Sequence, residues 1–492
     1  MMRSMYSAVS GLKSHQTKMD VIGNNVSNVN TVSFKSSSVT FNDIMYQTIA
    51  TASGANPETG TGGVNAKQIG LGVAVGSTQV SITSAGAAQS TGNPFDVRIT
   101  DANSTNFFIV NNGSENLFTR AGSFYVDGSG NLCMTSTGYT VMGWQTDPAT
   151  GEIKKDTVSP LTVMQTKNLT SAPEATTKAY VAGILDKEST DLNSDSGLTV
   201  TLNLYDQLGY QYTAKFKMTP NKAQQEVPNP DFDPDQPESD TNKKNITKEV
   251  VQEGKFDIEL TSVYGPEDAE GNSTNLLEGK DSDYISNNIF KKSTITFNTT
   301  DGTFESIGDS TDGVMQLNLA QLNDNGNGNP AGPLKAIDVD FKGIKNANNG
   351  KNSTVSITPG TSSMDTTGKG KKLGALTGLS IDTSGQIWGS YDNGNTVLLC
   401  QMAVAQFANA SGLEKVGENC YTTTLNSGDF DGIGVAITAD GSKMSSGQLE
   451  MSNVDLSQEF TDMITTQRGF QANSRIITTS DTLLEELVNL KR

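Results

Sequence analysis

The sequence has very few of the residues that build catalytic and metal sites. Its 492 residues include a single histidine, His15, and three cysteines, Cys133, Cys400 and Cys420. One histidine excludes a multi-histidine metal site, and any Ser-His-Asp triad would have to use His15. The cysteines are far apart, odd in number and without a CxxC spacing, which argues against a disulfide framework or structural zinc. We therefore expect no catalytic residues, no metal and no cofactor, and we expect that the chain is not an enzyme.

Basic charge and long apolar runs are also scarce. The chain has 54 acidic and 35 basic residues, a net charge of −19. Nucleic acids and anionic membranes bind basic surfaces, so neither is an expected partner. The longest nearly apolar stretch, 397–408, is interrupted by two glutamines and is shorter than the ~20 residues that cross a bilayer. We expect no membrane insertion, and since no cleavable leader is visible, export would need a route that removes none.

Both ends of the chain carry apolar residues that recur every seven positions. The N-terminal series is Met5, Leu12, Met19 and Val26; the C-terminal series is Leu456, Met463, Phe470, Ile477 and Leu484. A sustained seven-residue repeat is typical of coiled coils. Each stripe alone also fits an ordinary amphipathic helix packed on its own domain. Two such helices at opposite ends of a β-rich chain favour pairing with each other and with neighbouring copies.

The limits of these helices can be predicted from capping and propensity. Asn453 or Asp455 can cap the C-terminal helix, and acidic residues in its first turn favour the positive helix end. Glycine and asparagines between Gly23 and Asn30 lower helix propensity, so we expect the N-terminal helix to end there.

The interior has the period-two pattern of β-strands. Alternating apolar residues over 198–205 and 210–218, separated by a turn, predict a half-buried hairpin. A stretch rich in proline and acidic residues, from Pro220 to about Lys248, predicts a surface loop. A Gly- and Thr-rich segment over 50–63 predicts a linker, and 323–332 another loop.

Short sequence words at both ends resemble the flagellar rod and hook protein family. They are SAVSGL at 7–12, GNNVSNVNT at 23–31, SNVDL at 452–456 and QRGFQAN at 467–473. Interior words resemble the hook branch of the family: TRAGSF at 119–124, LYD at 204–206, FAN at 407–409 and LEELV at 484–488. One departure is that 101–106 precedes Phe107 and Phe108, where the family usually has a short Gly-Asp-Gly turn.

The resemblance implies an α+β multidomain fold, with paired N- and C-terminal coiled-coil helices and β-rich outer domains. It implies four parts: an inner helical domain from 1–30 with 453–492, a linker region over 31–70, a first β-rich outer domain from 71–165 with 362–452, and a second from 166–361. The two apolar series would then make the contacts within the coiled coil and between subunits.

The resemblance also implies a function: a structural subunit that polymerises into a flexible curved tube, the hook joining rod to filament. The expected partners are further copies of the chain, the hook cap, distal rod and hook-filament junction proteins, and the flagellar type III export apparatus. Its expected location is the flagellar hook, outside the cell after export. A distal rod protein is the nearest alternative. A secreted glycan-binding or glycan-cleaving β-sandwich protein is another, although only two tryptophans, Trp144 and Trp388, could form an aromatic platform.

Overall fold

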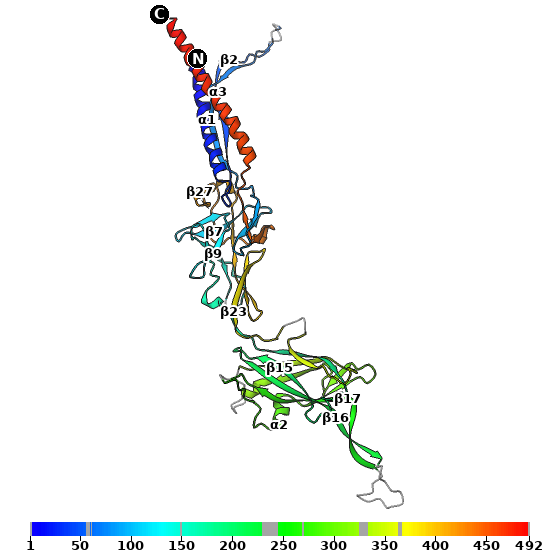
Figure 1. Ribbon diagram of the computed structural model, residues 1–492. Coiled ribbons are helices and arrows are strands. Elements are labelled where there is room, and N and C mark those ends of the chain that lie inside the picture. Colours follow the sequence, from blue (N-terminus) through cyan, green and yellow to red (C-terminus); the bar gives the residue numbers. More distant parts are fainter. Residues whose placement is uncertain are drawn as a thin grey trace, which may run out of the picture. The chain divides into compact units, whose positions relative to one another are not determined.

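Two long helices lie at the ends of the chain and strands fill the middle (Figure 1). The computed structural model describes residues 2–55, 60, 62–147, 150–228, 245–267, 270–323, 333–362 and 367–490. The chain divides into two compact units. The first unit contains Met1–Leu169, Thr377–Ser390 and Thr396–Arg492, and the second contains Thr170–Leu376 and Tyr391–Asn395. The expected class, terminal helices with a β-rich middle, is confirmed.

Helix α1 spans Met2–Ser27 and helix α3 spans Leu456–Asn489. The end of α1 lies within the predicted interval. Of the two predicted caps for α3, Asp455 is the one used, because its carboxylate accepts hydrogen bonds from the backbone amides of Ser457 at 2.8 Å and Gln458 at 3.4 Å. These bonds satisfy two of the amide groups that a helix start leaves unpaired.

The segment 31–70, expected as a linker region, has regular structure of its own. Strand β1 (Ser37–Asp43) pairs antiparallel with β4 (Val73–Val80), and β2 (Tyr46–Ala50) pairs with β3 (Lys67–Gly70). The predicted linker over 50–63 falls at the far end of the β2–β3 hairpin, where Ser53 bridges Val64; its residues 56–59 and 61 lie outside the described ones.

The body of the first unit is a mainly antiparallel sheet in the order β24-β25-β11-β7-β8-β28-β27. Its central strands are apolar on both faces; Phe107 to Val110 in β7 are completely buried. The strand bounds are β5 Ala88–Ser90, β6 Val97–Thr100, β7 Asn106–Asn111, β8 Asn116–Thr119, β9 Phe124–Val126, β10 Leu132–Met134, β11 Thr140–Gln145, β12 Ser159–Pro160, β24 Gln386–Tyr391, β25 Thr396–Met402, β26 Val404–Gln406, β27 Glu414–Gly417, β28 Cys420–Thr422, β29 Lys443–Ser446 and β30 Gln448–Glu450.

Strands from two distant parts of the sequence, 88–100 and 443–450, pair with each other in this body. β29 pairs with β6, and β30 pairs with β5. Since α3 begins shortly after β30 and α1 ends shortly before β1, both chain ends leave the body at one place.

The second unit contains two sheets that share one apolar core. The sheets have the orders β20-β21-β14-β22 and β15-β16-β17-β18-β19. Residues of both, such as Val181, Phe216 and Phe341, belong to that core. The elements are β13 Thr170–Ser171, β14 Lys178–Leu185, β15 Leu198–Tyr205, β16 Gln211–Pro228, β17 Asn245–Tyr264, the short helix α2 Ser282–Tyr284, β18 Ser293–Phe297, β19 Phe304–Ile307, β20 Val314–Asn318, β21 Ala336–Asn346, β22 Ser356–Pro359 and β23 Gly374–Ile381, which continues into the first unit.

The predicted hairpin over 198–218 is confirmed, with Leu198 opposite Met218 and Tyr205 opposite Gln211. The predicted loop from Pro220 to about Lys248 is wrong in its described parts, because β16 continues to Pro228 and β17 begins at Asn245. A register shift between Pro220 and Lys222 accommodates the proline, and the two strands stay paired beyond it, from Lys222 opposite Val251 to Pro228 opposite Asn245. Residues 229–244, and 324–332 of the other predicted loop, lie outside the described ones.

Candidate assembly site: the terminal helices and their junction

Helices α1 and α3 run antiparallel in close contact. Gly11 of α1 lies beside Asn473 of α3, and Gly469 of α3 lies beside the ring of His15; a Cβ atom on either glycine would come within 2.7 Å of that neighbour. Further along, the Asn25 side chain donates to Glu459 Oε1 at 2.8 Å. The glycines therefore permit an approach that larger residues would prevent.

The buried part of this helix interface consists mostly of small or polar side chains. On α1 the buried residues are Ala8, Gly11, Ser14, Ile22 and Asn25, and on α3 they are Thr466 and Ser480. Polar side chains also contact each other across the two helices, including an ion pair between Lys18 of α1 and Asp462 of α3 at 3.4 Å. Ile22 is the one large apolar side chain among these buried residues.

The predicted apolar series lie on the two helices that form this interface. Eight of the nine residues are half-buried, namely Met5, Leu12, Met19, Val26, Met463, Phe470, Ile477 and Leu484. The ninth, Leu456, is 38% exposed. On α3, Met463, Phe470, Ile477 and Leu484 lie three or four positions from the buried Thr466 or Ser480 and share their helix face, and each side chain keeps some exposed surface that a neighbour could cover.

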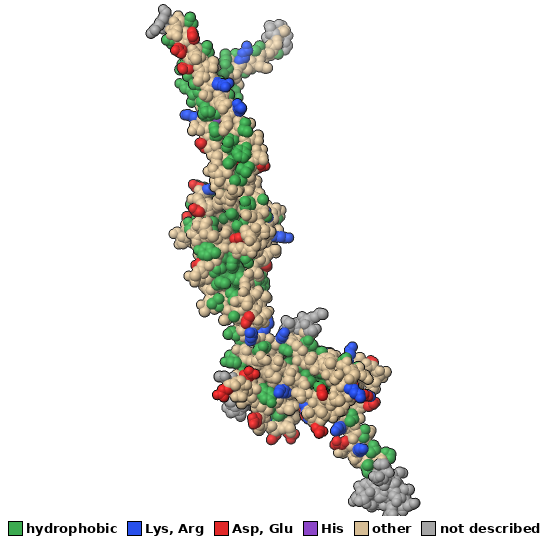
Figure 2. Space-filling model, in the orientation of Figure 1, with side chains coloured by type: hydrophobic (Ala, Val, Ile, Leu, Met, Phe, Trp, Pro, Cys, Tyr) green, Lys and Arg blue, Asp and Glu red, His purple; other side chains and the backbone are tan. Residues whose placement is uncertain are grey.

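Several other apolar side chains of α3 are exposed. Ile464 is 58% exposed and Leu490 is 81% exposed. The other exposed apolar residues of α3 are Phe460, Ile476, Leu483, Leu487 and Val488. Figure 2 shows apolar side chains along the helices, interrupted by scattered charges. So many uncovered apolar side chains on one element mark an interaction surface.

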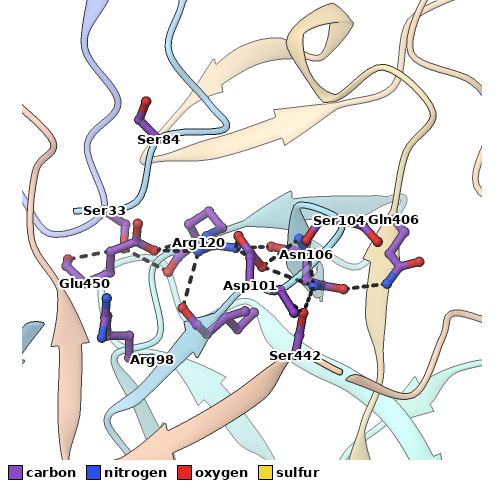
Figure 3. Close-up of polar contacts among 12 residues, drawn as sticks. Ser33, Ser84, Arg98, Asp101, Ser104, Asn106, Arg120, Gln406, Ser442 and Glu450 are labelled. Carbon is purple, nitrogen blue, oxygen red and sulfur yellow. Dashed lines mark hydrogen bonds and ion pairs between the residues drawn. The ribbon is translucent and has the colours of Figure 1, made fainter. Parts of the chain in front are cut away.

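The two chain ends are joined to the body by a buried cluster of charged side chains. Lys35, which follows α1, lies 2.7 Å from Glu450, which precedes α3. Arg120 binds Glu450 at 3.0 Å and Asp101 at 2.8 Å. Figure 3 shows Arg120 between the two carboxylates. The side chains of Lys35, Arg120 and Glu450 are each 1% exposed, so these charges depend on one another for compensation.

Backbone groups complete this junction. The Lys35 ammonium donates to the Ser84 carbonyl at 2.6 Å, and the Gly86 amide donates to Glu450 at 2.9 Å. Ser33 is buried in the left-handed region, at φ 57°, and its hydroxyl donates to the Arg120 carbonyl. A serine in that conformation is held there by its surroundings.

The electrostatics of the junction favour an ionised Glu450. Burial alone would raise the pKa of Glu450, but Arg120, Lys35 and the Gly86 amide together hold it below its ordinary value. Burial lowers the pKa of Lys35, and Glu450 opposes that shift. The contacts of Glu450 with two cations favour its ionised form, and the negative charge of that form opposes the loss of the Lys35 proton.

Two asparagines fasten the helices to this junction. Asn25 donates to the Ser37 carbonyl at 2.8 Å and accepts from the Ser37 amide at 2.9 Å, which fixes α1 to the start of β1. Asn453 accepts from the Ser36 amide at 2.7 Å and donates to the Ser81 carbonyl at 2.9 Å. Neither residue was among the predicted site residues, although both lie within the words that carry the family resemblance.

The cysteines, possible metal-ligand groups and long helices can each be located in the structure. Cys133, Cys400 and Cys420 are buried free thiols, and burial raises the pKa of Cys400 to about 12 and that of Cys420 to about 11. Within the described residues, no group of three or more His, Cys, Asp or Glu is placed to hold a metal ion. No helix in the same residues is long and apolar enough to span a membrane.

Comparison with known proteins decides the family. The flagellar hook protein FlgE of Treponema pallidum is 34% identical over the full length of both chains, and so is FlgE of Borreliella burgdorferi. The chain belongs to the flagellar hook protein family. Models of the flagella basal body rod protein and of the C-terminal region of the flagellar basal body rod FlgEFG proteins match residues 5–35 and 445–490 of this hook-family chain.

Two further similarities are to a rod protein and to a solved hook protein. The flagellar basal-body rod protein FlgG of Bacillus subtilis is 28% identical over the full length of both chains. The crystal structure of Helicobacter pylori flagellar hook protein FlgE2 aligns with 74% of this chain and all of that one, at 14% identity and a TM-score of 0.38, too low to compare folds. The matched regions 5–35 and 445–490 contain all of α3, nearly all of α1 and, from the charged cluster, Lys35 and Glu450.

Proposed function

We propose that this chain is a structural subunit of the bacterial flagellar hook, which polymerises into a flexible curved tube that links rod to filament for motility. The observation that carries the proposal is the uncovered apolar surface on α1 and α3 in a member of this family. The role is structural rather than enzymatic. The chain's location is accordingly the flagellar hook, outside the cell.

The proposed contacts between subunits use the two apolar series. Met5, Leu12, Met19 and Val26 on α1, with Leu456, Met463, Phe470, Ile477 and Leu484 on α3, would pack as a coiled coil that is completed by helices of neighbouring copies. Their partial exposure supports this arrangement, because burying the remaining surface would contribute roughly 25 cal/mol per Å². A tube that grows at one end needs such contacts between different surfaces, so that the polymer does not close.

Each predicted domain is assigned a position in the proposed tube. Residues 1–30 with 453–492 would line the inside of the tube. Residues 71–165 with 362–452, and 166–361, would form its outer parts, with 31–70 between inner and outer parts. The buried junction supports this role, since it fixes where both helices leave the β body.

The remaining partners follow from the family. Export through the flagellar type III apparatus, growth beneath a hook cap, and attachment to distal rod and hook-filament junction proteins are proposed for this chain. A distal rod protein is the second candidate, because the Bacillus rod protein is similar over its whole length. Complementation distinguishes the two: the gene should restore motility to a hookless strain and fail to restore a strain that lacks the distal rod.

Polymerisation is tested with the purified full chain. Electron microscopy of the concentrated protein should show tubes. Replacing Phe470 and Ile477 by serine should prevent them, since both side chains lie on the proposed seam. A matched control is Val416→Ser, which removes a 57% exposed apolar side chain from β27 of the body. Tubes from the seam variant, or no tubes from the unaltered chain, would overturn the proposal.

A further inference from the structure

The β2–β3 hairpin exposes an unusually apolar surface. Every residue of β2 and of β3 is exposed. The large apolar side chains here are Ile44, Met45, Tyr46, Ile49, Val64 and Ile69, each between 44% and 63% exposed. A two-stranded hairpin is marginally stable alone in water, so this one needs a covering partner.

The base of the hairpin is fixed while the rest projects from the unit. The Val73 amide donates to the Ser10 hydroxyl of α1 at 3.2 Å, and Gly72 also lies against that side chain. β2 and β3 then extend away from α1 and α3 (Figure 1). The hairpin is therefore presented on a firm base rather than folded onto its own chain.

The last turns of α3 lack a neighbouring helix within the described part of the chain. Gly11 lies beside Asn473, and the helices are antiparallel, so the described start of α1 at Met2 lies near residue ~482 of α3. Beyond that point Leu483, Leu487 and Val488 are 51%, 49% and 65% exposed. Figure 1 shows the C-terminal end of α3 beyond the N-terminus of α1.

The described part of the hairpin carries one positive charge and the last turns of α3 carry several negative ones; Glu58, between β2 and β3 in the sequence, lies outside the described residues. Lys67 is the only charged side chain in the described residues 44–71. Residues 481–490 of α3 carry three acidic side chains, Asp481, Glu485 and Glu486, and no basic one; Lys491 and Arg492 lie outside the described residues. Acidic side chains near a helix C-terminus oppose the helix dipole, so a cation from a partner would stabilise them.

We propose that the β2–β3 hairpin of one copy packs on residues 483–490 of α3 in a neighbouring copy, with Lys67 facing the acidic side chains. The contact rests on the proposed polymerisation and names one of its interfaces. The two surfaces are different, so the contact is heterologous and leaves a free hairpin and a free helix end at opposite ends of any assembly. Repeated from copy to copy, it builds an open helical assembly as long as the rotation between copies does not close a ring.

Cysteine cross-linking tests the contact directly. Tubes of the double variant Ile69→Cys/Leu487→Cys, under mild oxidation, should give a ladder of covalent multimers on a denaturing gel. The native cysteines are buried, so tubes of the unaltered chain and of each single variant provide low-background controls. Tubes without a ladder, or a cross-link confined to single chains, would contradict the proposed contact.

Charge exchange provides a second test. Lys67→Glu should slow tube growth, measured by light scattering, by about tenfold, because it places like charges together. Adding Glu485→Lys and Glu486→Lys to the same chain should restore most of the rate. Failure of the exchange to restore it would refute the pairing. If the unaltered chain forms no tubes, the proposed function fails instead, so the two results are distinguishable.

Discussion

Lys35, Arg120 and Glu450 are among the most buried side chains of the first unit, although each carries a charge. They come from the segment after α1, the end of β8 and the segment before α3. Taking such groups out of water is unfavourable unless they compensate one another. The cluster therefore requires all three chain segments to be in place together, and it fixes both helix exits relative to the body.

Glu450→Ala should strongly destabilise the first unit. It leaves Lys35 and Arg120 buried without their shared partner, so we expect a loss of about 3 to 5 kcal/mol in the free energy of unfolding. Urea unfolding followed by the fluorescence of Trp144 and Trp388, both in this unit, measures it. The control is Asp156→Ala, which removes an exposed ion pair with Lys154 and should cost under about 1 kcal/mol. Equal losses would refute the cluster's role.

The cluster should also weaken in acid. The pKa of Glu450 is lowered in the folded chain, so its contribution is present above the unfolded value of about 4.3 and is lost as the pH falls through the lower folded value. The difference in unfolding free energy between the unaltered chain and Glu450→Gln should therefore shrink from pH 7 to pH 3. A difference that stays constant over this range would show that Glu450 does not titrate as described.

At the scale of single residues, the sequence showed the short motifs that resemble the family, but it did not show which contacts the residues of those motifs make. Asn25 and Asn453 appeared only as a helix breaker and a possible cap, whereas each bonds backbone groups far along the chain. Lys35, Arg120 and Glu450 carry no local signal, because their pairing is set by contacts up to 415 positions apart. Such partnerships are invisible to periodicity, which reports only on neighbours within one element.

The sequence correctly predicted the helices and the hairpin in which apolar residues recur at regular spacing. Both helices and the hairpin over 198–218 follow directly from spacing. The extended arm of β16 and β17 was mistaken for a loop, because it contains prolines and charges and is held by the pairing of its two strands, which no local apolar pattern reveals. The seven-residue series correctly placed the helices, but the side chains buried between them are small and polar ones that such a series does not reveal.

The close approach of α1 and α3 makes a prediction about two glycines. Gly11→Ala and Gly469→Ala should lower the melting temperature of the tubes, since each methyl group would meet Asn473 or His15 within 2.7 Å. Gly23→Ala is the control: it lies on α1 with nothing within 4 Å of an added Cβ, and should stabilise the helix by up to about 1 kcal/mol. Adding His15→Ala should partly rescue Gly469→Ala. Identical behaviour of all three glycine variants would contradict the packing described.

At the scale of the whole molecule, the second unit can be removed as one piece. Ser171 and Gly374 pair across β13 and β23, so residues 172–373 leave and re-enter at neighbouring positions. Joining Ser171 to Gly374 should leave a chain that still forms tubes, with altered curvature or stiffness in electron micrographs. Contacts between helices are untouched by this deletion. Complete loss of tubes would show that the second unit is needed for polymerisation itself.

The central claim is that the apolar surfaces of α1 and α3 are sheltered mainly between copies. Hydrogen exchange, measured on the soluble chain and on its tubes, tests this claim most directly. We predict that amides of α1 and α3, including those of Leu12 and Phe470, exchange rapidly in the soluble chain and become strongly protected in tubes, while buried amides of β7 are protected in both. Strong protection of the helices already in the soluble chain, unchanged on assembly, would contradict the account.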